Sequence, residues 1–173
     1  MGYAGGEQEN PTYRKMGDHT ETLQVDYDAS LISYGELLET YWSSHNPFRQ
    51  TTSRQYMNII FVHNDEQERL ARDSKALLAQ QQNRNVATHI VSFSKFYLAE
   101  DYHQKYYLQS ISPLMKEYML IFSDFEDFVH STAAARVNGY VAGYGDTASL
   151  TKELAELGLS EAGTEILQRL VKR

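Results

Sequence analysis

The spacing of apolar residues changes once along this chain, and that change limits the folds open to it. Up to about residue 93, short apolar runs of strand length alternate with stretches of helical spacing, whereas after Ser94 only helical spacing recurs. Strands mixed with helices, followed by helices alone, predict an α+β region and then an all-α region. We place the boundary near residue 110, which gives an α+β domain over residues 1–110 and a helical extension over residues 111–173.

Three segments of the first region are predicted to be strands. In residues 21–27, apolar and polar residues alternate, as in a strand with one buried face. Residues 56–62 form an almost continuous apolar run, which favours a strand that is buried on both faces. Residues 86–93 form a shorter third strand. The first nineteen residues are rich in glycine and turn-forming residues and are predicted to be a loop.

Capping residues mark the helix starts. Ser33 with Glu36 three residues later is a capping box, and Asn64 can cap a second helix whose first turn is acidic. Three serines mark starts in the second region: Ser112, Ser123 and Ser160. Between these helices, residues 139–145 are punctuated by glycine and are predicted to be a loop.

The composition excludes several classes of function. Sixteen lysine and arginine residues stand against 23 aspartate and glutamate residues, a formal net charge of −7. Nucleic acids and anionic membranes need a basic surface, so neither is expected as a partner. No cysteine occurs, which removes disulfides, zinc–thiolate sites and thiol nucleophiles from this sequence. No signal peptide is visible, so a cytoplasmic location is expected unless an upstream segment carries targeting information.

Glu21 is the most informative single residue for chemistry. It shares the strand parity of Leu23, Val25 and Tyr27, and so begins the predicted buried face. A carboxyl group there loses hydration, which favours its protonated form and suits a general acid near neutral pH. The alternative, favoured by parity alone, is a solvated carboxylate just outside the sheet.

Tyrosines are the next candidates, because a phenol can donate a hydrogen bond to a polarised oxygen. Tyr3, Tyr13 and Tyr56 are singled out, although packing is the commoner role for any one of thirteen tyrosines. The six histidines contain no pair at i, i+4 spacing, so no metal site is expected. No phosphate-binding loop or nucleophile elbow occurs, so no bound cofactor is expected.

Taken in order, several short motifs resemble the peptide methionine sulfoxide reductase A family. They are Gly-Tyr-Ala-Gly-Gly at 2–6, Asn-Pro-Thr-Tyr at 10–13, Gly-Asp-His-Thr-Glu at 17–21, Ile-Ser-Tyr at 32–34, Trp-Ser-Ser-His-Asn-Pro at 42–47, Gln-Tyr at 55–56 and Phe-Tyr-Leu-Ala-Glu-Asp-Tyr-His-Gln at 96–104. Each motif is weak alone, but their order and spacing over residues 2–108 are specific. Residues 131–140 resemble the longer form of the family, which carries a helical C-terminal extension.

The resemblance implies a fold, a reaction and roles for five residues. The fold is a two-layer, ferredoxin-like α+β sandwich. The reaction is reduction of methionine-S-sulfoxide, in proteins or as the free amino acid: a cysteine or selenocysteine attacks the sulfur, a glutamate protonates the oxygen and two tyrosines help to hold it. By position, Glu21 is the glutamate and Tyr13 and Tyr56 are the tyrosines, while Tyr3 and His103 are expected to bind substrate. A thioredoxin-type reductant is implied as a partner.

Two departures from the family pattern bear on activity. The family's Gly-Cys-Phe-Trp-Gly segment precedes the motif with which this chain begins, so the nucleophile, the first strand and its helix are expected to be absent and the chain alone to be inactive. One explanation is a selenocysteine codon read as a stop. The usual aspartate of the family is Thr51 here, and Arg54 is expected to replace part of its role. Two alternatives stay open: a non-catalytic relative that binds oxidised methionine or a protein partner, and a helical interaction module over residues 111–173.

Overall fold

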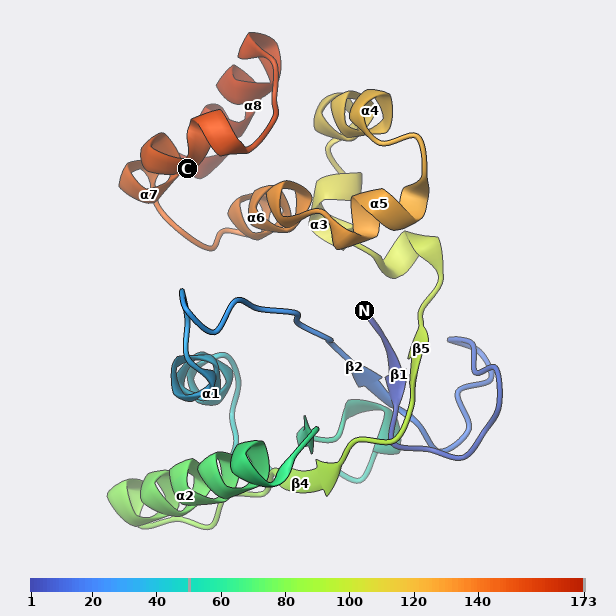
Figure 1. Cartoon of the computed structure of the whole chain (residues 1–173), viewed down its shortest axis with the longest axis vertical. Helices are drawn as coiled ribbons and strands as arrows, with labels where there is room; N and C mark the ends of the chain where they lie inside the picture. Colours follow the sequence, from blue (N-terminus) through green and yellow to red (C-terminus); the bar gives the residue numbers. More distant parts are fainter. Residues whose placement is uncertain (50, 173) are drawn as a thin grey trace. The chain divides into compact units, whose positions relative to one another are not determined.

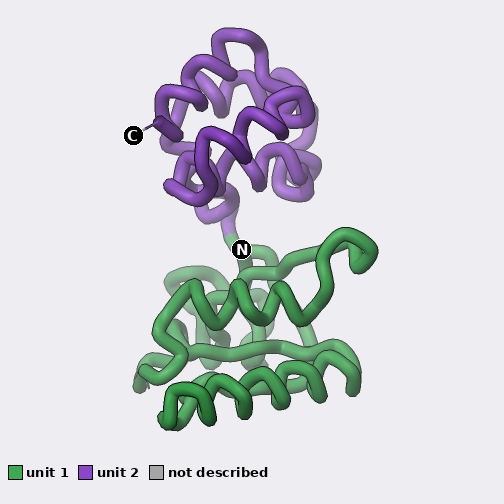
Figure 2. Tube along the Cα trace, turned by 90° about the vertical axis from the view of Figure 1, so that its left-hand side faces the viewer, with its two compact units in different colours: residues 1–99 green, residues 100–173 purple. Residues whose placement is uncertain are grey.

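The computed structural model describes residues 1–49 and 51–172. They form two compact units, residues 1–99 and residues 100–173 (Figure 2). Every strand of the described residues belongs to the first unit, and the second unit is helical (Figure 1). This arrangement confirms the α+β class followed by a helical C-terminal region. The division falls after Ala99, somewhat before the boundary that the sequence placed near residue 110.

Two small sheets lie in the first unit. β1 (Gly2–Ala4) lies between β2 (Thr20–Thr22) and β5 (Phe96–Leu98) and is antiparallel to both. β3 (Ile59–Val62) and β4 (His89–Ser92) form a parallel pair. Parallel strands need a long connection, which here contains the helix α2.

Two helices cover the parallel pair. α1 (Tyr34–Ser43) lies beside α2 (Asp65–Gln82) (Figure 1). Both helices contribute to a core with β3. The buried residues of this core are Leu38, Ile60, Val62 and Ala71. Ile60 and Val62 alternate with half-buried neighbours, so the predicted burial of both faces of this strand was wrong.

The first predicted strand was too long. β2 ends at Thr22, and Leu23 and Val25 are 66% and 53% exposed. Its partner β1 pairs with Thr20–Thr22, and among the described residues no strand pairs with Leu23 or Val25. Alternation alone did not make a strand, because a strand needs a partner for its backbone hydrogen bonds.

Other strand limits also differ from the prediction. Residues 54–56 form the 3₁₀ turn η1 (Arg54–Tyr56), so β3 begins only at Ile59. β4 is shorter than the predicted segment 86–93. β1 lies in the segment that was predicted to be a loop. Glycine at position 2 permits the close pairing of β1 with β5, because a Cβ there would collide with the Phe96 ring. β5 itself lies in a region that was predicted to be helical.

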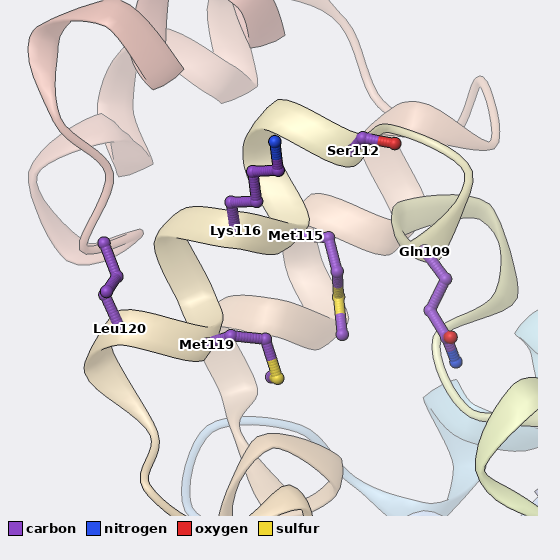
Figure 3. A pocket seen from close by; sticks show the side chains of 6 residues that line it. All are labelled: Gln109, Ser112, Met115, Lys116, Met119 and Leu120. Carbon is purple, nitrogen blue, oxygen red and sulfur yellow. The ribbon is translucent and has the colours of Figure 1, made fainter.

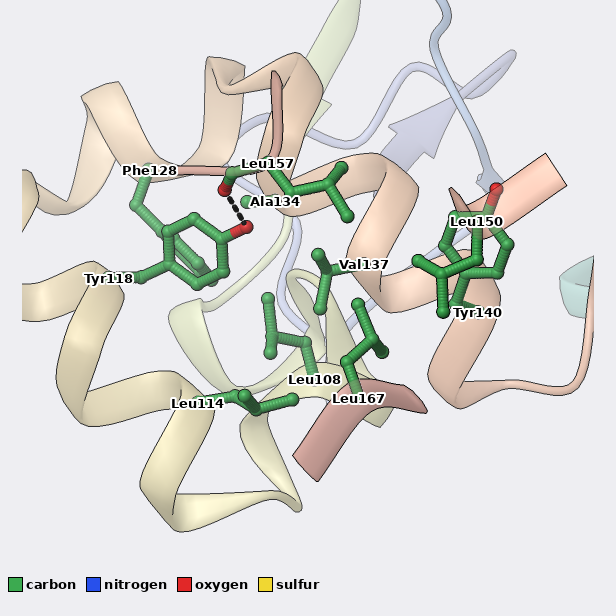
Figure 4. Packing of buried hydrophobic residues seen from close by; sticks show 10 residues of the cluster. All are labelled: Leu108, Leu114, Tyr118, Phe128, Ala134, Val137, Tyr140, Leu150, Leu157 and Leu167. Carbon is green, nitrogen blue, oxygen red and sulfur yellow. Dashed lines mark hydrogen bonds between the residues drawn. The ribbon is translucent and has the colours of Figure 1, made fainter. Parts of the chain in front are cut away.

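The second unit is a set of short helices around one apolar core. Its helices are α3 (Tyr106–Gln109), α4 (Ser112–Ile121), α5 (Phe125–His130), α6 (Thr132–Val141), α7 (Thr147–Glu153) and α8 (Glu161–Val171), with 3₁₀ turns η2 (Asp101–His103) and η3 (Leu154–Glu156). Figure 4 shows the ten buried residues of the core. Among them the Tyr118 hydroxyl donates a hydrogen bond to the Leu157 carbonyl oxygen at 2.7 Å, and burial raises the pKa of this phenol.

Most predicted helix starts are confirmed. The side chains of Ser33, Asn64 and Ser160 each accept a hydrogen bond from a backbone N–H of the first turn. The cap of α5 is Asp124 rather than Ser123, since the Asp124 carboxylate accepts the Glu126 N–H. The glycine-punctuated loop is also shorter than predicted, because residues 139–141 continue α6.

Candidate functional site

Four polar side chains of the first unit come together from three separate segments. Gln55 Nε2 donates a hydrogen bond to Glu21 Oε1 at 2.6 Å, which joins η1 to the centre of β2. The Tyr56 phenol interacts with the phenol of Tyr13, which lies in the loop between β1 and β2, and this interaction is the largest cause of the raised pKa of Tyr56. The structure therefore brings together the three residues that the sequence proposed as catalytic.

The electrostatics of the cluster act on Tyr56. Its pKa is raised above the ordinary value of 10.0, first by the hydrogen bond with Tyr13, then by partial loss of hydration and by the charges of Tyr13 and Glu21. The Gln55 side chain acts in the opposite direction, because its amide stabilises the phenolate and so lowers this pKa. The net effect keeps the Tyr56 phenol protonated, and hence a hydrogen-bond donor, at neutral pH.

β2 fixes the backbone of Glu21. In the β1–β2 register Glu21 lies directly opposite Tyr3, and residues opposite each other project from the same face of a sheet. Tyr3 is 1% exposed and packs with Met16 and Ala99. Glu21 is half-buried. Its exposure is therefore intermediate between the two alternatives that strand parity left open, a buried acid and a solvated carboxylate. Substrate binding by Tyr3 stays a prediction.

The loop that carries Tyr13 is fixed at its two ends. The Gly6 N–H donates to His19 Nδ1 at 3.1 Å, so His19 Nε2 carries the hydrogen and donates to the Gln8 carbonyl oxygen at 2.8 Å. His19 is 1% exposed, and this buried pair of bonds closes the loop. The Asp18 carboxylate accepts the N–H groups of Glu7 and Gln8, and these bonds lower the pKa of Asp18.

Two further positions singled out from the sequence belong to other segments of the chain. His103 belongs to η2 of the second unit, where its ring is 4.2 Å from the Tyr102 ring between centroids, and its role in substrate binding stays a prediction. Thr51, at the position of the family aspartate, accepts the Ser53 N–H with its hydroxyl oxygen at 3.2 Å. Thr51 thus stabilises the turn that leads into η1.

Sequence reasoning missed the role of Gln55 in this cluster. It named Gln55 only as part of the Gln-Tyr motif and assigned it no contact. The sequence feature that could have indicated this role is the position of Gln55, next to the candidate Tyr56 in a motif that precedes an apolar strand. An amide in that place can donate a hydrogen bond to a nearby carboxylate.

The second unit has an open surface hollow of about 570 Å³ (Figure 3). It is lined by Gln109, Ser112, Met115, Lys116, Met119 and Leu120. None of the predicted site residues lines it.

In the described part of the chain, no group of three or more histidine, cysteine, aspartate or glutamate side chains could hold a metal ion. No helix among these residues is long and apolar enough to cross a membrane.

Comparison with known proteins decides the family. The model of the family described as peptide methionine sulfoxide reductase matches residues 1–136. The chain belongs to this family. A second model, described as the helical domain of selenoprotein methionine sulfoxide reductase A, matches residues 123–172. The family match confirms the resemblance that the motifs indicated, and the second match agrees with the helical second unit.

Three relatives show how far the family likeness extends. A peptide methionine sulfoxide reductase of Drosophila melanogaster is 42% identical over 165 residues, which cover 92% of this chain and 65% of that protein. Peptide methionine sulfoxide reductase A5 of Oryza sativa is 39% identical over 82% of this chain and 58% of its own length. A reductase of Saccharolobus solfataricus is 36% identical over 71% of this chain and 80% of its own length. The chain thus spans less than two thirds of the first two relatives.

Proposed function

We propose that this chain serves in the reduction of methionine-S-sulfoxide, in oxidised proteins or as the free amino acid, with Glu21 as the proton donor. One observation carries the proposal: in a chain of this reductase family, Gln55 donates a hydrogen bond to Glu21, and the Tyr13 and Tyr56 phenols belong to the same interacting cluster. Relatives named peptide methionine sulfoxide reductases support the substrate class.

The cluster suits a sulfoxide oxygen. That oxygen is a polarised acceptor, and phenols are donors that are protonated at neutral pH. Tyr13 and Tyr56 are 42% and 57% exposed, so an external ligand can reach both. Glu21 is within the same cluster and half-buried, the setting in which a carboxylic acid gives up a proton during reaction.

The chemistry balances as an oxygen transfer. A thiol or selenol attacks the methionine sulfur, Glu21 protonates the oxygen, and the S–O bond of the sulfoxide breaks. Methionine sulfur is reduced by two electrons, and the nucleophile is oxidised to a sulfenic or selenenic acid that holds the oxygen. A thioredoxin-type dithiol then reduces this acid to the thiol or selenol and water, and becomes a disulfide.

The nucleophile of this scheme lies outside these residues. The 173 residues contain no cysteine, so another segment or another chain has to supply the thiol or selenol. The same fact favours a second candidate function, in which the chain binds oxidised methionine, free or in a protein partner, without turnover. Binding of the sulfoxide with no turnover in the presence of an added nucleophile segment would favour this second function.

The test joins a segment containing Gly-Cys-Phe-Trp-Gly to the N-terminus of the chain. We expect this extended protein to reduce N-acetylmethionine-S-sulfoxide, and the 173-residue chain alone to give no turnover with dithiothreitol. In the extended protein, Glu21→Gln should slow single-turnover reduction by roughly 10²–10⁴-fold, because the amide cannot give up a proton. The loss should shrink at low pH, where solvent supplies the proton.

Two controls accompany this test. Glu39→Gln removes an exposed carboxylate of α1 and should leave the reduction rate unchanged. The R-epimer of the substrate should not be reduced. A Glu21→Gln protein that reduces the S-epimer at the parental rate at neutral pH would refute the role of Glu21.

A further inference from the structure

Arg54 binds the two ends of the loop that carries Tyr13. Its guanidinium donates from Nε to the Asp18 carbonyl oxygen at 2.8 Å and from Nη2 to the Gly5 carbonyl oxygen at 2.6 Å. Gly5 directly follows β1, and Asp18 lies just before β2. A single side chain of η1 therefore holds both ends of the loop between these two strands.

The turn is also bound to β2. The hydroxyl of the buried Thr20 donates to the Arg54 carbonyl oxygen at 2.9 Å. The next residue of the turn, Gln55, donates from Nε2 to Glu21 Oε1 at 2.6 Å. Side chains of β2 and of η1 thus each bind the other segment, which leaves η1 little freedom to move relative to Glu21.

Other hydrogen bonds at the ends of the loop stay within it or reach only the start of β2. The Gly6 N–H donates to His19 Nδ1 at 3.1 Å, and the Asp18 carboxylate accepts two backbone N–H groups from the opposite end of the loop. These bonds close the loop, but none of them reaches η1. The bonds of Arg54 attach the closed loop to the turn that precedes β3.

The bonds of Arg54 depend on direction more than on charge. Both acceptors are neutral carbonyl oxygens, and no aspartate or glutamate among the described residues forms an ion pair with this guanidinium. A guanidinium presents its N–H groups in a rigid, planar fork, whereas a lysine ammonium is a compact point charge. Two carbonyl groups held side by side therefore require arginine.

Glycine at position 5 permits this approach. Gly5 has a φ of +79°, which disfavours any residue with a side chain, and a Cβ there would lie 2.7 Å from the Phe61 ring. Without a side chain, the Gly5 carbonyl group can face Arg54 while β3 packs close by. The loop, the turn and the strand are thus fitted to one another at this point.

We propose that Arg54 is a positioning residue: by binding both ends of the loop at once, it sets the positions of Tyr13 and Tyr56 relative to Glu21. The proposal rests on the proposed function, in which the two phenols hold the sulfoxide oxygen that Glu21 protonates. Reaction rates depend steeply on such placement, since a displacement of about 1 Å can lower a rate by roughly 10²-fold. Arg54 itself does not touch the substrate in this role.

Chymotrypsin tests the attachment in the 173-residue chain, without turnover. This protease cleaves after tyrosine, and Tyr13 and Tyr56 lie exposed on the two segments that Arg54 joins. In Arg54→Ala we expect cleavage after both tyrosines to be roughly tenfold faster, because two hydrogen bonds that oppose local opening are lost. Cleavage after Tyr144, an exposed residue of the second unit, is the internal reference and should not change.

Matched variants separate this role from general destabilisation. Arg72→Ala removes a guanidinium that bonds Glu68 on its own helix, and should leave all these cleavage rates unchanged. Arg54→Lys keeps the charge and should be cleaved almost as fast as Arg54→Ala. Added ethylguanidine should slow the cleavage of Arg54→Ala, whereas ethylamine should not. Unchanged cleavage after Tyr13 and Tyr56 in Arg54→Ala, shown to be folded by circular dichroism, would overturn the proposal.

The extended protein with the Gly-Cys-Phe-Trp-Gly segment tests whether this placement matters for the reaction. Arg54→Ala should lower the rate of single-turnover reduction by roughly 10–100-fold. Ethylguanidine should restore part of that rate and ethylamine none, while Arg72→Ala should react at the parental rate. A parental rate in Arg54→Ala would overturn the positioning role, even if the cleavage results agree with it.

The two experiments also separate this proposal from the proposed function. If Arg54→Ala is slow and recovers with ethylguanidine while Glu21→Gln reduces substrate at the parental rate, positioning by Arg54 stands and the role of Glu21 as proton donor fails. If Glu21→Gln is slow and Arg54→Ala is not, the role of Glu21 stands and positioning by Arg54 fails.

Discussion

Gly163→Ala should destabilise this protein, although alanine is the better helix former. Gly163 lies in the first turn of α8, where alanine would by itself favour the helix by about 0.8–1.0 kcal/mol. A Cβ at this position, however, would lie 2.5 Å from Glu117 Oε2. The Glu117 carboxylate accepts the backbone N–H of Ser160 at 2.8 Å and the Ser160 hydroxyl at 2.7 Å. The new methyl group therefore displaces an acceptor that fixes the start of α8 against α4.

The magnitude follows from setting these two effects against each other. A typical hydrogen bond contributes about 1 kcal/mol net, and one to a buried charged group contributes more; because Ser160 is exposed, we take about 1 kcal/mol for each of the two bonds, or about 2 kcal/mol together. Subtracting the gain in helix propensity, Gly163→Ala lowers the free energy of unfolding by about 1 kcal/mol. In a Glu117→Ala background the displaced carboxylate is absent, so the same substitution should raise stability by about 0.8–1.0 kcal/mol.

Urea unfolding followed by circular dichroism measures both signs in a double-mutant cycle. Gly139→Ala is the control, since Gly139 is helical and a Cβ there would meet nothing within 4 Å. It should stabilise the chain in both backgrounds. Stabilisation by Gly163→Ala in the presence of Glu117, or the same sign in both backgrounds, would refute the reasoning.

Two further predictions concern buried phenols. Tyr118→Phe removes the donor to the Leu157 carbonyl oxygen and leaves that oxygen unpaired, so urea unfolding should show a loss of about 1–3 kcal/mol; a neutral effect would mean that water replaces the phenol. Burial raises the pKa of Tyr41 to about 12, only partly offset by the Thr88 hydroxyl. Because the folded state holds this proton more tightly than the unfolded state, the stabilisation is complete below pH 10 and is lost as the pH rises to 12. Tyr41→Phe should flatten this alkaline loss in a pH series of unfolding midpoints, and an unaltered pH dependence would count against it.

Helix starts could be predicted because capping is local. Ser33 with Glu36, and Ser160 before Gly163, each satisfy backbone N–H groups within three residues of the cap, so the sequence contains the whole interaction. The start of α5 shows the limit of such patterns. Ser123 and Asp124 can both cap a helix, and the structure uses the carboxylate.

Strands could not be predicted equally well, because their partners lie far away in the chain. β1 pairs with residues about twenty and about ninety-five positions later. Gly2 was predicted to lie in a loop, yet it is a strand residue, because it pairs with Thr22 and Leu98. The Phe96 ring leaves no room for a side chain at this position. Leu23 and Val25 had the alternation of a strand and lie exposed, since no strand in the described part of the chain pairs with them. The local alternation of apolar and polar residues indicates candidate strands, but only those that pair with a partner strand form.

The candidate site shows the same limit in its chemistry. Strand parity alone favoured a solvated carboxylate for Glu21 over an acid on a buried face, and only the family resemblance, which matches Glu21 to the glutamate of the family, indicated the acid. The bonds that assemble these residues run from side chains to distant backbone groups, as from Arg54 to the carbonyl oxygens of Asp18 and Gly5. The periodicity of apolar residues does not indicate such bonds, because they follow neither a helical nor a strand repeat. A site assembled from loops in this way keeps its geometry only while those backbone bonds persist, so its function should be more sensitive to Arg54 and Gln55 than to changes in the apolar core of β3 and α2 that leave the chain folded.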